Sequence, residues 1–190
     1  MELQFNKIEE KIFRDCAYYI DLLKNCKRGY FLLRGTFNKI DGIQKFQHDS
    51  NFRKPRDTPQ NIHDKINDFF LEKFGWKIRN GVFTYGFDVL SNEPTDLGYG
   101  DFKLFFPIGD FNFVQNSEHF DLYGALHQRK TDIDTFISGL QFYQDDLCAS
   151  MNTRQDYHDF GNETSIKTNE YYLVNLKFAE ELAIKIWPII

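Results

Sequence analysis

The stretch that most constrains the fold of this chain lies near its C-terminus, at residues 168–176. It contains no Gly or Pro, and aromatic and aliphatic side chains occupy both of its alternating faces. A short run that is apolar on both faces predicts a buried strand. Glu170 stands at the start of this strand, where burial would remove water from its carboxylate. Such an acid is either a polar strand start that faces solvent or a paired or functional group.

Composition narrows the class of protein. The 190 residues suffice for one domain with a real core, and we expect a single domain over residues 1–190. Aromatic residues make up 17%, so rings should fill much of that core. A net charge of -5 argues against a general binder of nucleic-acid backbones. No apolar run approaches the roughly 20 residues of a membrane span, and the N-terminus lacks a signal-peptide layout, so we expect no membrane partner.

The cysteines and histidines show neither a disulfide pattern nor the spacing of metal ligands. Cys16, Cys26 and Cys148 are odd in number and widely spaced, which predicts reduced thiols in a cytoplasmic protein. The five histidines show no metal-ligand spacing, so no metal site is expected.

Hydrophobic periodicity predicts an α+β chain. Helices are expected at 7–27, 60–74, 131–148 and 177–187, and strands within 30–36, 79–86, 102–109, 111–114 and 168–176. The helix at 7–27 should pack on the sheet, and Thr58-Pro59 should supply the N-cap and first residue of the helix at 60–74. Residues 37–60 are expected to be irregular, and 149–168 to form a long exposed loop, which in a compact domain suggests a functional segment.

Two short motifs carry candidate chemistry. The strand at 30–36 ends in Arg34-Gly35, and a Gly there lets a backbone or ligand approach closely. The alternative is a plain strand-to-turn transition with a solvated Arg34. The basic run from Arg53 to Arg56 binds phosphates or an acidic partner, or it is a solvated loop, and these alternatives stay open.

Taken in order, these segments resemble the ADP-ribosyltransferase superfamily. Its members share a three-part NAD signature: an Arg-Gly or His-Gly at the end of the first strand, a strand with an aromatic residue or Ser/Thr, and a Glu that begins a late strand after a mobile loop. Leu32 to Thr36 is similar to the Arg-Gly form of the toxin-like branch, and Asn169-Glu170-Tyr171 to the Asn-Glu-Tyr strand of the polymerase branch. Phe83 and Thr84 stand in the middle segment.

The resemblance implies a fold, an activity and a site. The fold is an ADP-ribosyltransferase-like split β-sandwich with peripheral helices, and NAD is the substrate. Glu170 and Arg34 would be catalytic, with Glu170 holding the ribose 2′-hydroxyl and Arg34 contacting the pyrophosphate or ribose. The cofactor-binding residues would be Arg34, Gly35, Phe83, Thr84 and Tyr99, in which Gly35 receives the nicotinamide amide and Phe83 or Tyr99 stacks on the ring.

Two departures from the family pattern narrow this activity. The position two before Glu170 is Thr168, where arginine-modifying toxins carry Glu or Gln, and the first motif has Arg34 where polymer-forming members have His. The expectation is therefore a mono-ADP-ribosyltransferase that modifies a macromolecular acceptor, either protein or nucleic acid, such as an effector carried by a phage or bacterium. The alternative is a catalytically silent module of this fold that binds NAD, ADP-ribose or a protein partner. A third reading is a structural or inhibitor protein whose motifs match by chance.

Overall fold

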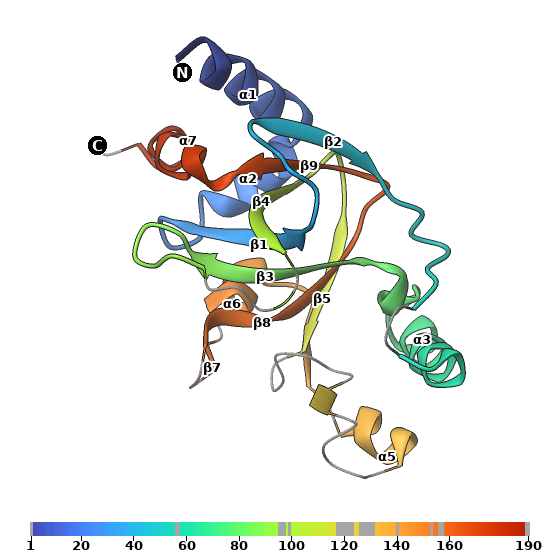
Figure 1. Cartoon of the computed structure of the whole chain (residues 1–190). Helices are drawn as coiled ribbons and strands as arrows, with labels where there is room; N and C mark the ends of the chain where they lie inside the picture. The colour runs from blue at the N-terminus through green and yellow to red at the C-terminus, as the bar shows by residue number, and fades with distance from the viewer. Residues whose placement is uncertain are drawn as a thin grey trace.

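A computed structural model describes residues 2–55, 58–94, 98, 100–116, 124–125, 132–139, 141–152, 154–155 and 158–188 (Figure 1). Of residues 2–3, 143, 150–152, 154–155 and 158–161 it describes the backbone alone. The chain is a mixed α+β structure, as expected. Its helices are α1 (Glu2–Asp15), α2 (Ala17–Leu23), α3 (Gln60–Phe74), α5 (Ile133–Ser138), α6 (Leu147–Asn152) and α7 (Ala179–Ile186), with short 3-10 turns η1 (Ile78–Asn80) and η2 (Leu176–Phe178).

The strands form an antiparallel sheet of order β2-β9-β4-β1-β3-β8-β5-β6, and β7 pairs with β8. They are β1 (Tyr30–Thr36), β2 (Ile43–Gln47), β3 (Val82–Asp88), β4 (Asp101–Pro107), β5 (Asn112–Asn116), β6 (Phe142–Tyr143), β7 (Arg154–Gln155), β8 (His158–Lys167) and β9 (Glu170–Asn175). The expected strand at 168–176 is thus confirmed as β9, which lies between β2 and β4. Four of its six residues are buried.

The expected helix at 7–27 is two helices that meet at Cys16. The carbonyl of Asp15 accepts the backbone N–H of Gly109 at 2.9 Å, from the turn after β4, so this carbonyl is engaged outside the helix. The apolar stripe nevertheless continues across the break and packs on the sheet as predicted. The ring of Tyr19 lies edge-on to Phe106 of β4 at 5.7 Å, and its hydroxyl accepts the backbone N–H of Leu32 in β1.

Helix α3 has the predicted range of 60–74 and ends at Gly75, whose φ of +74° is the left-handed conformation typical of a helix C-terminus. The expected Thr58 cap is wrong by one residue, since Pro59 occupies the N-cap position with no side-chain hydrogen bond. The tail at 177–187 forms η2 and α7, and α7 lies beside α1 in Figure 1, where Lys185 pairs with Glu9 at 3.1 Å.

Three segments differ from their expected structure. Residues 37–60 contain β2, and half of the expected exposed loop at 149–168 is β8, the strand between β3 and β5. In place of one helix at 131–148 the chain forms α5, β6 and the start of α6, with Asp132 capping α5 through the N–H of Thr135 at 3.0 Å. The sequence pattern predicted a loop at β8 because this strand is rich in polar residues, but several of these polar side chains are buried in the structure.

Two apolar cores support these elements. The larger one joins α1, α2 and α7 to strands β1, β3, β4 and β9, and contains rings such as Phe31, Phe105 and Phe106. The smaller one joins α3, η1 and α5 to β5 through Phe70, Trp76 and their neighbours. In Figure 1, α3 and α5 accordingly lie away from the helices at the two chain ends.

Strand β1 changes partner along its length. Its residues Tyr30–Leu33 pair with β3, whereas Leu33–Thr36 pair with β4. The pairing between β1 and β3 therefore stops just before Arg34. The backbone of β3 at Phe83 lies beyond this point, and its carbonyl accepts a hydrogen bond from the guanidinium of Arg34 at 2.9 Å instead.

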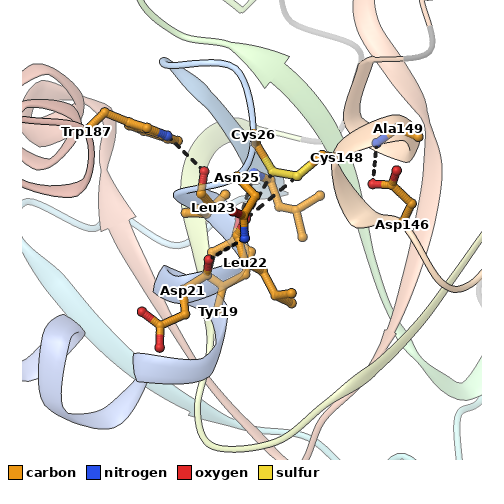
Figure 2. Close-up of a disulfide and its surroundings, with 11 residues drawn as sticks. Tyr19, Asp21, Leu22, Leu23, Asn25, Cys26, Asp146, Cys148, Ala149 and Trp187 are labelled. Carbon is orange, nitrogen blue, oxygen red and sulfur yellow. Dashed lines mark hydrogen bonds between the residues drawn. A yellow bond between two sulfur atoms is a disulfide. The ribbon is translucent and has the colours of Figure 1, made fainter.

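The expectation of three reduced thiols is wrong for two of them. Cys26, just after α2, and Cys148 in α6 form a disulfide between residues 122 apart in sequence (Figure 2). Counting the cysteines could not reveal this pairing, because it depends on the fold bringing α6 against α2. Cys16 is free and buried. Since disulfides persist mainly in oxidising compartments, the cysteines do not support the cytoplasmic expectation. Near the disulfide, the indole of Trp187 donates to the carbonyl of Leu23 at 2.9 Å.

Candidate functional site

Three arginines from separate segments contact Phe83 in β3, two of them at its ring and one at its backbone carbonyl. We call Arg34, Arg53 and Arg79 the arginine cluster. The guanidinium carbon of Arg53 lies 3.9 Å from the centre of the Phe83 ring, and that of Arg79 lies 4.4 Å from it. Arg34 donates to the carbonyl of the same residue. Cation–π contacts favour this arrangement, but they also bring like charges together.

The members of the arginine cluster have different partners. Arg53 donates to the carbonyl of Gly81 at 3.1 Å. Arg79 pairs with the carboxylate of Glu163 in β8 at 2.9 Å, and the two side chains are only 9% and 11% exposed. The Nε of Arg79 is buried and has no hydrogen-bond partner among the residues that the structure describes. This atom is a donor that a ligand oxygen would satisfy.

The cluster carries excess positive charge. Within the described ranges, Glu163 is the only carboxylate that forms an ion pair with any of the three arginines. Burial and, to a smaller extent, the charges of Arg79 and Arg34 together lower the pKa of Arg53 to about 10. With that pKa, Arg53 remains charged at neutral pH. Partly buried cations without enough carboxylates form a site that favours an anion.

A buried polar network fixes the segments that carry the cluster. Asn67 of α3 accepts the backbone N–H of Arg79 at 2.9 Å and donates to the side chain of Asn80 at 3.0 Å. Asn80 in turn donates to the carbonyl of Asn51 at 2.7 Å. Asn67 and Asn80 are both nearly inaccessible to solvent. Through these bonds, α3 holds η1 beside the segment that leads to Arg53.

His48 follows β2 and joins the same network. Its Nε2 lies 2.6 Å from the carbonyl of Asn80, and its backbone N–H donates to the carbonyl of Asn169 at 2.7 Å. Because a carbonyl can only accept, the Nε2 atom carries the proton and Nδ1 keeps a lone pair. Burial lowers the pKa of His48, and the charges of Arg34 and Arg53 act in the same direction against the raising effect of the Asn80 bond.

The structure brings together some of the residues that the sequence singled out. Arg34 and Phe83 are in contact, and Gly35 lies beside them in β1, paired with Phe102 of β4. Thr84 is fully buried, and its hydroxyl donates to the carbonyl of Thr164 at 3.1 Å. Tyr99 and Arg56 lie outside the described residues.

Glu170 lies on the other face of the sheet from the arginine cluster. Its carboxylate pairs with Lys45 of β2 at 2.8 Å. The next residue, Tyr171, has its ring 5.9 Å from the guanidinium carbon of Arg34, and successive side chains of a strand point to opposite faces. Tyr172 continues the alternation, since its hydroxyl donates to Asp15 of α1 at 2.7 Å.

Glu163 is the acid that sequence reasoning missed. A signal existed, because the chain contains three Asn-Glu pairs, at 92–93, 162–163 and 169–170. The last pair begins an obviously apolar strand, whereas the strand around Glu163 is rich in polar residues. The cross-strand pairing of Glu163 with Tyr85 of β3, which decides its position, is a tertiary property.

No protein-family model, curated protein or solved structure matches this chain. Among the described residues there is no group of three or more His, Cys, Asp or Glu that could hold a metal ion. Within the same residues, no helix has the length and apolar character needed to cross a membrane.

Proposed function

We propose that this protein is a mono-ADP-ribosyltransferase that cleaves NAD at the arginine cluster and transfers ADP-ribose to a macromolecular acceptor. The observation that carries the proposal is the meeting of Arg34, Phe83 and Glu163 from strands β1, β3 and β8. These are the three residue types of the NAD signature, in the order in which the signature has them. The parting of β1 from β3 at Arg34 is consistent with the split sheet that the resemblance implies.

In this proposal, Glu163 takes the role that the sequence had suggested for Glu170. Leaving of nicotinamide develops positive charge on the ribose, as in glycoside cleavage. A carboxylate beside the ribose offsets this charge and accepts a hydrogen bond from the 2′-hydroxyl. Glu163 stands next to the cations that would bind phosphate in this proposal, whereas Glu170 faces Lys45 on the opposite side of β9.

The arginine cluster would bind the pyrophosphate of NAD. Guanidinium groups suit phosphate because they present several donors in a planar fork. The buried Nε of Arg79 and the half-buried Arg53 and Arg34 offer such donors. The Phe83 ring has two guanidinium groups over it, so we assign it to the positioning of these cations.

The test is release of nicotinamide from NAD by the purified protein, measured with and without a cell lysate as a source of acceptors. We expect turnover, and label from NAD in either protein or nucleic acid identifies the acceptor class. Glu163→Gln should lower the rate on the order of 10²–10³-fold, because it removes a preorganised charge. The proposal is wrong if the wild-type protein releases no nicotinamide under any of these conditions.

One observation favours a second function, a catalytically silent module that binds NAD or ADP-ribose. The carboxylate of Glu163 is already paired with Arg79 at 2.9 Å, so this acid has a structural partner. A silent module would show NAD raising the melting temperature without any release of nicotinamide. Turnover that depends on Glu163 excludes it.

A further inference from the structure

We propose that His48 is the general base that takes the proton from the acceptor during ADP-ribose transfer. This inference rests on the proposed function and deepens it, since it assigns a residue to a step for which the NAD signature supplies none in this chain. The arginine-modifying members of the superfamily carry Glu or Gln two positions before the catalytic acid. Here the residue two before Glu163 is Gly161, and the residue two before Glu170 is Thr168.

The tautomer of His48 suits a proton acceptor. The 2.6 Å contact from Nε2 to the carbonyl of Asn80 fixes the proton on Nε2. The backbone of His48 is fixed as well, through the carbonyl of Asn169. The side chain therefore presents an Nδ1 lone pair from a fixed ring, which is what a proton acceptor needs.

His48 also lies near the arginine cluster. Asn80, which holds the ring, directly follows Arg79, and Arg79 holds Glu163. The imidazole also lies within electrostatic reach of Arg34 from β1 and of Arg53 from its own segment, with Asp49 as the nearby acid. His48 is half-buried, so part of its side chain is open to solvent.

The charges around His48 keep it ready to accept a proton. Burial and the two arginines lower its pKa, so the imidazole is neutral at pH 7 and stays neutral below the usual value of about 6.5. Phosphates bound to Arg34 and Arg53 would reduce this repulsion and make His48 a stronger base only when substrate is present.

Transfer of ADP-ribose to the acceptor forms one bond at C1′ of the ribose and breaks another. The acceptor oxygen or nitrogen forms a bond to C1′ of the ribose while the bond from C1′ to nicotinamide breaks. The electron pair of the broken bond leaves with nicotinamide, which departs as a neutral molecule. The proton of the acceptor passes to Nδ1 of His48, and the imidazolium then returns it to water.

The test compares two nucleophiles on one variant. Methanol must lose a proton when it attacks the ribose, whereas azide attacks as an anion and needs no base. His48→Gln is the variant, because the amide of Gln can still donate to the carbonyl of Asn80. Nicotinamide release from NAD is followed with each nucleophile at constant ionic strength, and NAD affinity is measured separately.

We expect His48→Gln to slow the methanol reaction on the order of 10²–10⁴-fold and to change the azide reaction less than threefold. The acidic limb of the wild-type pH profile with methanol, with an apparent pKa below 6.5, should disappear in the variant. Equal losses with both nucleophiles would show that His48 only positions the site, and no loss with methanol would overturn its role entirely. If the wild-type protein releases no nicotinamide with either nucleophile, the proposed function fails and this inference fails with it.

Discussion

Arg53 is the member of the arginine cluster whose replacement separates ligand binding from stability most cleanly. We expect Arg53→Met to leave the free energy of unfolding within about 1 kcal/mol of the wild-type value while removing the response to an anionic ligand. Methionine keeps the apolar contact with the Phe83 ring and removes the charge.

The magnitude follows from terms of opposite sign. The fall of the Arg53 pKa from its ordinary value to about 10 corresponds to a destabilisation of about 3 kcal/mol, at about 1.4 kcal/mol for each pKa unit. Its charged hydrogen bond to the Gly81 carbonyl stabilises by about 1.5–3 kcal/mol, and the contact with Phe83 adds up to about 2 kcal/mol. These contributions nearly cancel. Arg79→Met differs, because it removes the ion-pair partner of the buried carboxylate of Glu163 and should cost about 3–5 kcal/mol.

Urea unfolding of the two variants, each with and without pyrophosphate, measures both quantities. Pyrophosphate at 100 times its Kd should stabilise the wild-type protein by about 2.7 kcal/mol and Arg53→Met by much less. Lys54→Met is the matched control, since Lys54 is the exposed neighbour of Arg53 and should keep the full response. If Arg53→Met destabilises the protein as much as Arg79→Met does, Arg53 is a structural residue and its assignment to anion binding is wrong.

Two further predictions concern the scaffold of the site. The Cys26–Cys148 disulfide closes a loop of 122 residues, so a reductant should lower the free energy of unfolding by up to about 5 kcal/mol. The same reductant should leave the stability of a Cys26→Ala/Cys148→Ala variant unchanged. Equal melting temperatures of the wild-type protein with and without reductant would contradict this prediction. Asn67→Leu removes the hydrogen bonds made to the backbone N–H of Arg79 and to the side-chain oxygen of Asn80, and it should cost about 2–5 kcal/mol in chemical denaturation. Asn61→Leu on the exposed side of α3 should stay within about 0.5 kcal/mol. Similar losses in both variants would point to helix propensity instead of the network.

Elements with a strong apolar period were predictable from the sequence. Helix α3 and strand β9 were correct, because their periodicity and the C-terminal Gly75 are local properties. Strand β8 was not, because several of its buried polar residues hydrogen-bond across strands: the carbonyl of Thr164 accepts from Thr84, and Asn162 donates to the carbonyl of Asn116 at 2.9 Å. A pattern method interprets such a segment as a loop.

The same limit applies to the candidate site. Arg34 and Phe83 were identified because each lies in a short motif that the sequence makes visible. Arg79 and Glu163 were not identified, since their pairing joins residues 84 apart and depends on β8 lying next to β3. The acid was sought in the strand with the clearer pattern, which placed it at Glu170.

Replacing Glu163 and Glu170 in turn tests which of the two acids belongs to the proposed NAD site. The measurement is the initial rate of nicotinamide release from NAD by Glu163→Gln and Glu170→Gln, beside the wild-type protein. The two variants make the same chemical change seven positions apart in sequence. We predict that Glu163→Gln loses on the order of 10²–10³-fold in rate, while Glu170→Gln stays within a few-fold of the wild-type protein. The opposite ranking, or equal rates in all three proteins, would contradict the assignment of the site to the arginine cluster and Glu163.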